Sequence, residues 1–288
     1  MSVRVGAVEG FESGGAPLDL GAESAAADVL GFRVARLSLD ETVVRCRDAI
    51  ASGDRLHQVS INAAKLVNAR RDERLAEVLR CADLLSADGQ SIVWASRILG
   101  NPIPERVAGI DLMIRLLDLA ECEGFSVFVL GARTDVLEAA IRKIHERHPL
   151  LNLAGSHHGY FDDDEGESIC ALINRAQPQL LLVAMSSPRK EFWVEANAGR
   201  LEVPVIVGVG GSIDVVAGVA ARAPRWMQRG GLEWAFRLAQ EPRRLWRRYL
   251  RTNTLFVALV VAALSRRAAN ATRRSRQEET EHVGTTAR

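Results

Sequence analysis

Asp88 is the side chain whose type and setting best suit acid–base chemistry. An apolar run at 84–87 precedes Asp88 and Gly89, and apolar residues at helical spacing follow from Ile92, which predicts a strand, a tight turn and a helix. Ligands bind at the carboxyl ends of strands in open parallel sheets, so a carboxylate there could act as a general base. The alternative is that Asp88 caps the helix that follows it. Both interpretations remain open from the residues alone.

Ser60, Asn62 and Arg106 supply hydrogen-bonding and cationic groups near two further strand ends. Ser60 and Asn62 close a short apolar run, and their spacing places both side chains on the same side of a strand. Arg106 lies between apolar residues in a connection rich in proline and glycine. Arginine at such a place is a common partner of phosphate or carboxylate. These strand ends could together form one pocket.

Two glycine turns suit a nucleotide. Gly131 follows the apolar run 127–130, and a strand–glycine–helix turn directs backbone N–H groups at a diphosphate, although a plain tight turn is the alternative. Gly210 and Gly211 follow another apolar strand and would let the backbone approach a nucleotide, while Asp214 could accept hydrogen bonds from ribose hydroxyls. A nicotinamide cofactor would also use such glycines, but the full Gly-x-Gly-x-x-Gly pattern is not present.

The elements that must position these residues alternate between strand and helix. Short apolar runs at 32–36, 57–62, 84–87, 127–130 and 180–184 are separated by helical patterns, for example at 39–50, 111–123 and 134–148. This rhythm is typical of a parallel sheet and predicts an α/β fold with a Rossmann-like sheet and flanking helices. We expect a disordered lead at 1–30, a catalytic domain at 31–233, a C-terminal helical membrane-binding appendage at 234–270 and a disordered tail at 271–288.

The composition fits a large core and a reducing compartment. The chain has 288 residues, of which 48% are hydrophobic and 25% are charged. Its four cysteines, at 46, 81, 122 and 170, are widely spaced, so they indicate neither a zinc site nor a disulfide framework. The first residues lack the basic and apolar segments of a secretory signal. A cytoplasmic enzyme is the expectation.

The C-terminal part of the chain is strongly cationic. From Arg222 onward it carries fifteen arginines and five glutamates, although the net charge of the whole chain is only +1. Aromatic residues alternate with arginines over 234–251, and ten apolar residues follow at 255–264, too few for a membrane span, which needs about 20. Such a segment can lie at a membrane surface with its arginines on anionic lipid. Packing of the apolar run into the core and a nucleic-acid patch are the alternatives.

These motifs in combination resemble the WecG/TagA/CpsF family of bacterial glycosyltransferases, over about residues 31 to 264. The motifs occur in order as Ser60-x-Asn62, Asp88-Gly89, Pro104-Glu105-Arg106-Val107-Ala108-Gly109, Leu130-Gly131, Ser187-Pro188-Arg189-Lys190-Glu191, Gly208-x-Gly210-Gly211-x-x-Asp214 and the segment from Arg222 to Arg244. The resemblance implies an inverting, metal-independent transfer of N-acetylmannosamine, glucose or a related sugar from a UDP-sugar to a polyprenyl-diphosphate-linked saccharide. It places the enzyme on the inner face of the cell membrane, in synthesis of a cell-envelope polysaccharide.

The resemblance also implies roles for individual residues. Asp88 would be the base and Arg106 would balance diphosphate charge, while Ser60 and Asn62 would orient substrate. Gly131, Lys190, Gly210, Gly211 and Asp214 would line the UDP site. Arginines from the appendage would contact the acceptor diphosphate or the membrane, namely Arg237, Arg244 and Arg247. No cofactor, bound metal or nucleic acid is expected, and a homo-oligomer is left open.

The sequence departs from the family at Lys190, where glutamine is usual, and at Ser60, where threonine is usual. The ammonium of Lys190 could serve a substrate phosphate or an acidic sugar, or it could pair with a neighbouring carboxylate. The acidic run 162–164 resembles an Asp-x-Asp metal motif, but it opens a predicted helix, where acidic residues are favoured. A nucleotide-sugar epimerase or dehydrogenase and a non-enzymatic cationic membrane adaptor are the alternative functions.

Overall fold

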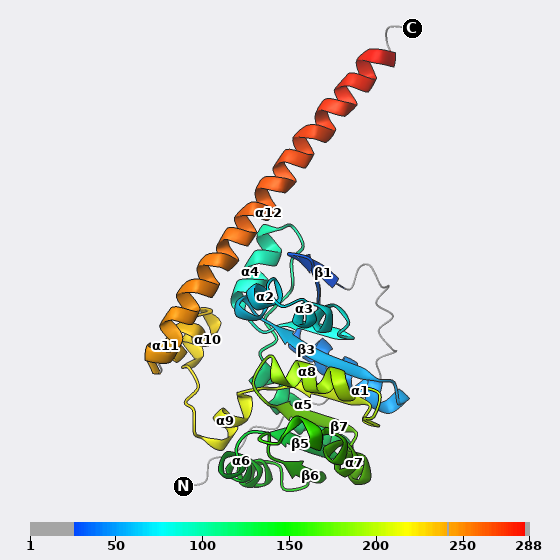
Figure 1. The fold of residues 1–288 in the computed structure, drawn as a ribbon, viewed down its shortest axis with the longest axis vertical. Helices are drawn as coiled ribbons and strands as arrows, with labels where there is room; N and C mark the ends of the chain where they lie inside the picture. The colour runs from blue at the N-terminus through cyan, green and yellow to red at the C-terminus, as the bar shows by residue number, and fades with distance from the viewer. Residues whose placement is uncertain (1–25, 241, 286–288) are drawn as a thin grey trace, which may run out of the picture.

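The computed structural model describes residues 26–240 and 242–285 (Figure 1). It consists of an α/β body, with helices on both faces of a parallel sheet, and a long C-terminal helix that runs along the body and then beyond it. The α/β class predicted from the sequence is confirmed. The body begins earlier than expected, because residues 26–29, assigned above to the disordered lead, form a strand.

The sheet has six parallel strands in the order β4-β3-β8-β7-β5-β6. The strands are β3 (Leu56–Ile61), β4 (Leu84–Ala87), β5 (Val127–Gly131), β6 (Leu153–His157), β7 (Leu180–Ala184) and β8 (Val205–Gly208). The register pairs Ile61 with Ala87, so the residues that follow these two strands, Asn62 and Asp88, leave the sheet next to each other. All six carboxyl ends meet at one edge because every pairing is parallel.

Alternate residues of each strand pack on opposite faces of the sheet, as the near-continuous apolar runs predict. In β5, Val127 and Val129 belong to one core cluster, whereas Phe128 and Leu130 belong to another. The first face is covered by α1 (Leu39–Ser52), α5 (Gly109–Glu123), α6 (Thr134–Arg147) and α9 (Ser212–Ala217). The second is covered by α2 (Ala63–Ala69), α3 (Glu73–Arg80), α4 (Gln90–Ile98), α7 (Gly166–Ala176) and α8 (Arg189–Asn197).

A small antiparallel hairpin lies beside this layer. It is formed by β1 (Ala26–Val29) and β2 (Phe32–Ala35) and packs on α3 and α4. The chain then enters α1 through a capping box, in which Ser38 and Glu41 each accept a hydrogen bond from the backbone N–H of the other. The short helix α2 was not predicted, because it has only seven residues and little hydrophobic periodicity.

The C-terminal part contains α10 (Arg225–Arg229), α11 (Glu233–Gln240) and α12 (Pro242–Thr285). Phe256 and Val260 of α12 are buried in the core cluster that includes α2, whereas Val257 and Val261 on its other side are more than half exposed. Core packing and an outward apolar surface therefore describe two faces of the same helix. The helix also continues through 271–285, where a disordered tail was expected. None of the described helices combines the length and apolar character that crossing a bilayer requires.

Candidate active site

Asp88 lies at the carboxyl edge of the sheet, in the turn between β4 and α4. Its backbone N–H donates to the Ile61 carbonyl over 2.9 Å, which ties the turn to β3. The carboxylate Oδ1 accepts the N–H of Gly109, at the start of α5, over 3.2 Å. The helix α4 is capped by Gly89 without a side-chain hydrogen bond, so the alternative that Asp88 caps its own helix is wrong.

The surroundings of Asp88 favour a carboxylate that can take up a proton. Burial raises the pKa of Asp88, while the Gly109 hydrogen bond and the charges of Arg237, Arg106 and Lys65 lower it; the net pKa is above its ordinary value. A raised pKa brings a carboxyl group closer to the range that a general base needs. The charge of Arg237, on α11, is thus one of those that act on Asp88 at the sheet edge.

Asn62 and Ser60 occupy different depths at the end of β3. Asn62 caps α2, where its Oδ1 accepts the N–H of Lys65 over 3.0 Å. Ser60 is buried below the edge, and its Oγ accepts from the Gln58 side chain over 3.4 Å. The structure thus brings Asn62 beside the Asp88 turn and leaves the Ser60 hydroxyl within the core.

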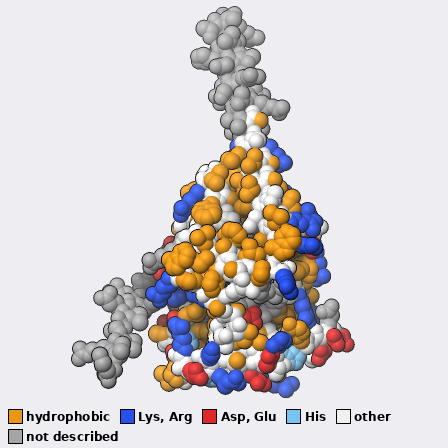
Figure 2. Space-filling model, turned by 90° about the vertical axis from the view of Figure 1, so that its left-hand side faces the viewer, with side chains coloured by type: hydrophobic (Ala, Val, Ile, Leu, Met, Phe, Trp, Pro, Cys, Tyr) orange, Lys and Arg blue, Asp and Glu red, His pale blue; other side chains and the backbone are white. Residues whose placement is uncertain are grey.

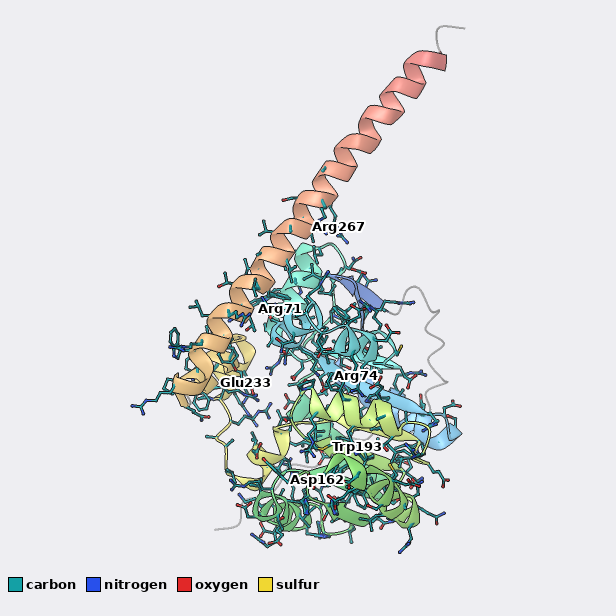
Figure 3. The ribbon with its side chains drawn as sticks, viewed as in Figure 1. Arg71, Arg74, Asp162, Trp193, Glu233 and Arg267 are labelled. Atoms are coloured by element: carbon teal, nitrogen blue, oxygen red, sulfur yellow. The ribbon has the colours of Figure 1, made fainter. Side chains whose placement is uncertain are left out.

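Arg106 connects the body to the C-terminal helices. Its guanidinium pairs with Glu233 of α11 over 2.7 Å, and Glu233 also pairs with Arg237 over 3.3 Å. Figure 3 shows Glu233 between the C-terminal helices and the body. Burial would raise the pKa of Glu233, but the hydrogen bond from Arg106 and the charges of both arginines hold it below its ordinary value. We call Arg106, Glu233 and Arg237 the appendage cluster. Arg106 of the body and Arg237 of α11 therefore share one carboxylate.

Of the other two predicted appendage arginines, the structure describes the side chain of Arg247 alone. The guanidinium of Arg247 lies 5.3 Å from the centre of the Trp246 ring, on the exposed part of α12. The side chain of Arg244 lies outside the described part of the chain. A role for either residue stays a prediction.

Lys190 belongs to a buried group of charges on the second face of the sheet. Its Nζ lies 3.0 Å from Oε1 of Glu191, and the same oxygen pairs with Lys65 over 2.7 Å. Lys65 also donates to the Ser60 carbonyl. We call Lys65, Glu191 and Lys190 the body cluster. Of the uses considered for Lys190, pairing with a neighbouring carboxylate is the one that the structure contains.

The charges of the body cluster are strongly perturbed. Burial, followed by the charge of Lys190, lowers the pKa of Lys65 to about 8. Burial opposes ionisation of Glu191, but the two lysines outweigh it and lower its pKa to about 2. Sequence reasoning missed Lys65, which no local motif distinguishes, and Glu191, which was quoted only as part of a motif.

The glycine turns lie across the sheet from Asp88. Gly131 has φ of +139°, and a Cβ there would lie 2.4 Å from the Ala184 carbonyl carbon, so no other residue fits between β5 and β7. Gly210 has φ of +53° and lies beside the end of Lys190, 3.6 Å from its Nζ to a Cβ built on the glycine. The turns that carry these glycines end β5 and β8, which flank β7 in the sheet.

Asp214 lies in the first turn of α9, close to Gly211. Arg133 donates hydrogen bonds to the Asp135 carboxylate, which raises the pKa of Arg133, and the charges of Tyr160 and Asp214 add to that shift. Arg133 and Asp135 follow β5, Tyr160 follows β6 and Asp214 lies in α9. Polar groups and bare backbone meet there, as a nucleotide site requires.

Around Asp88, cationic side chains outnumber carboxylates among the described residues. The two clusters and Asp88 together contain four cations and three carboxylates, namely Lys65, Lys190, Arg106 and Arg237 against Asp88, Glu191 and Glu233. An excess of positive charge at a partly buried edge favours an anionic ligand such as a diphosphate. Within the described side chains, no group of three or more His, Cys, Asp or Glu could hold a metal ion. Asp162 lies before a short 3₁₀ helix (Asp163–Glu165), with its N–H bonded to Glu165.

Comparison with known proteins shows the family of this chain. The model of the Glycosyl transferase WecG/TagA/CpsF family matches residues 27–270. Enzymes named N-acetylglucosaminyldiphosphoundecaprenol N-acetyl-beta-D-mannosaminyltransferase, from Staphylococcus aureus strains MW2 and NCTC 8325, are 31% identical to this chain over 226 residues, which cover 78% of the chain and 88% of each relative. The chain therefore belongs to the WecG/TagA/CpsF family and is a glycosyltransferase.

Proposed function

We propose that this enzyme transfers a sugar from a UDP-sugar to a saccharide linked to polyprenyl diphosphate, with inversion at the anomeric carbon. The observation that carries the proposal is the Asp88 carboxylate, placed at the sheet edge under the influence of Arg106 and Arg237. The printed names of the relatives describe transfer of N-acetylmannosamine to N-acetylglucosaminyl-diphosphoundecaprenol. The proposed donors are UDP-sugars that carry N-acetylmannosamine, glucose or a related sugar.

The reaction is a displacement at the anomeric carbon. Asp88 removes the proton of the acceptor hydroxyl as that oxygen forms its bond to the carbon. The bond from the carbon to the UDP oxygen breaks, and its electron pair leaves with the diphosphate. Positive groups fixed beside the leaving group stabilise this charge, which is the proposed role of Arg106 and Arg237. In this scheme the side chains themselves carry the proton and balance the charge.

The donor nucleotide is assigned to the loops after β5 and β8. Gly131, Gly210 and Gly211 would let the backbone approach the diphosphate, and Asp214 would accept from the ribose. Lys190 is the member of the body cluster that lies beside Gly210, where it adds positive charge to the floor of the site. Asn62 would orient the acceptor next to Asp88, and Ser60 would support it from below through the backbone of β3.

The acceptor is a lipid, and one face of the molecule suits a membrane surface. Figure 2 shows hydrophobic side chains gathered over the upper part of this face, with Lys and Arg at its flanks and Asp and Glu mainly below. Exposed apolar residues on or beside α4, α10, α11 and α12 are Trp94, Ile98, Trp226, Leu232, Trp234, Trp246, Leu250, Val257 and Val261. An apolar surface with a cationic rim is typical of proteins that lie on anionic bilayers. We therefore place the enzyme peripherally on the inner face of the membrane.

Replacing Asp88 with Asn tests the assigned base. The amide cannot take up the proton, so we expect turnover to fall by roughly 10²–10⁴-fold while UDP affinity changes little. Transfer is measured with a lipid-diphosphate N-acetylglucosamine acceptor across a donor panel, and UDP binding by calorimetry. Asp40→Asn, an exposed carboxylate paired with Arg115, is the matched control. Unchanged turnover in the Asp88 variant would remove the base from the mechanism.

The membrane face is tested at exposed positions of α12, because removing the whole helix would also uncover the apolar surface of α2. Leu250→Ser with Val257→Ser should weaken sedimentation with anionic vesicles, since each change removes apolar area that would enter the interface. Leu150→Ser, at an 83% exposed residue outside this face, is the control. Equal sedimentation of both variants and the wild type would contradict the assignment.

A further inference from the structure

An open groove lies apart from the sheet edge, where the start of α1 meets the end of α4. Its volume is about 510 Å³. It is lined by Arg36, Glu41, Arg97, Pro102, Ile103 and Pro104. Glu105, next in the chain, is not among the lining residues, and its side chain accepts the Leu39 N–H over 2.6 Å. The groove therefore borders the connection that carries Arg106 without containing any residue of the proposed active site.

The two arginines of the groove have almost no polar partners. The Nε of Arg36 is buried and unbonded, and Arg36 makes no ion pair with any residue that the structure describes. Arg97 has one long contact, 3.4 Å from a guanidinium nitrogen to the Pro104 carbonyl. The Glu41 carboxylate is already used, because its Oε2 accepts the Ser38 N–H over 2.7 Å. The unpaired buried Nε of Arg36 is costly, and the exposed guanidinium of Arg97 has only one long contact, so an anion that bonded both guanidinium groups would stabilise the groove.

The surroundings of the groove identify the source of such an anion. Trp94 and Ile98 lie one turn apart on α4, are 47% and 57% exposed, and flank Arg97 in the sequence. The α12 helix passes the same end of α4, where an Arg267 nitrogen lies 3.7 Å from a Cβ built on Gly100. Arginines beside exposed aromatic and aliphatic side chains match the two parts of a phospholipid, its phosphate and its chains.

We propose that this groove binds the phosphate of an anionic phospholipid headgroup through Arg36 and Arg97. The inference rests on the proposed membrane face and adds a specific lipid site on the catalytic body. Because the groove borders the Arg106 connection, an occupied groove would hold that connection against α1 and α4 while the enzyme is on the membrane.

The test uses the full chain with Arg36→Gln and Arg97→Gln together. Binding is measured to vesicles of phosphatidylcholine with and without phosphatidylglycerol. We expect affinity for the phosphatidylglycerol vesicles to fall roughly fivefold for each arginine, with binding to pure phosphatidylcholine unchanged. Arg147→Gln with Arg175→Gln, exposed on α6 and α7, removes the same charge elsewhere as a matched control. An equal loss in the control, or no loss in the groove variant, overturns the proposal.

Two further measurements separate the possible failures. Saturable binding of glycerol 3-phosphate that the groove variant abolishes, without any vesicle effect, would assign the groove to a soluble phosphate and overturn the lipid assignment. UDP affinity and transfer to a water-soluble acceptor should stay at wild-type level in the groove variant. If the wild type does not bind vesicles at all, both the membrane face and the groove assignment are wrong. If the wild type binds vesicles and the groove variant binds them equally well, only the groove assignment is wrong.

Discussion

The body cluster and the appendage cluster have the same composition, one glutamate between two cations, but different exposure. In the body cluster the side chains of Lys65, Glu191 and Lys190 are 6%, 1% and 10% exposed. In the appendage cluster, Arg106 and Glu233 are 14% and 12% exposed and Arg237 is 51% exposed. The first joins two helices on one face of the sheet, and the second joins the body to α11.

This difference separates charges that support the fold from charges that can act on a ligand. Two ammonium groups and a carboxylate removed from water depend on one another, because loss of one partner leaves an uncompensated charge. Guanidinium groups at a partly open edge can exchange a carboxylate for a diphosphate, since the fork geometry suits both. The appendage cluster therefore couples the position of α11 to the charge around Asp88.

Replacing Glu191 with Gln should give the larger stability loss of the two clusters. It leaves Lys65 and Lys190 buried without a carboxylate, so we expect the free energy of unfolding to fall by roughly 3–5 kcal/mol. Deprotonation of Lys65, whose pKa is already about 8, would reduce the loss at alkaline pH. Urea denaturation at two pH values measures both effects.

Lys190→Gln is the control for that change, because it restores the residue usual in the family and leaves the Lys65–Glu191 pair neutral. Its effect on stability should be small, and the pKa of Lys65 should rise once the neighbouring charge is gone. A Glu191 variant as stable as this control would show that the body cluster does not support the fold.

Glu233→Gln should instead affect the appendage and spare the sheet. Hydrogen bonds to charged groups contribute roughly 1.5–3 kcal/mol, so the free energy of opening α11 should fall by about that amount. Amide exchange in α11 should therefore become faster, while exchange in β3 and β4 stays unchanged. Transfer should weaken, because Arg106 and Arg237 would lose their shared position. Asp40→Asn, which breaks an exposed pair with Arg115, is the control for a surface ion pair. Unchanged exchange in α11 would remove the link between appendage and body.

The sequence predicted what repeats locally and missed what depends on distant contacts. Apolar runs and caps located most strands and helices, and the position of Asp88 at a sheet edge followed from its strand–turn–helix pattern. The partner of its carboxylate, Gly109, is 21 residues away, and Glu233 is 127 residues from Arg106. No periodicity encodes such pairs, so neither cluster could be assembled from spacing. Likewise, the apolar run of α12 did not reveal which of its faces packs on α2.

The smallest expected effect comes from His57, which borders the body cluster. Burial lowers its pKa to about 4, against the charges of Asp83 and Glu191, which raise it, while Lys65 and Lys190 add to the lowering. The unfolded chain, with an ordinary pKa near 6.5, therefore binds more protons between about pH 4 and 6.5, and stability falls as the pH falls through that window. Allowing for partial exposure, the loss should be about 1–2 kcal/mol. In His57→Asn the free energy of unfolding should no longer change between pH 4 and 6.5. The loss of stability at about pH 2–4.5, which comes from protonation of Glu191, should remain. A wild-type curve that is already flat between pH 4 and 6.5 would mean that His57 takes up its proton over the same pH range in the folded and the unfolded chain, which would contradict the lowered pKa.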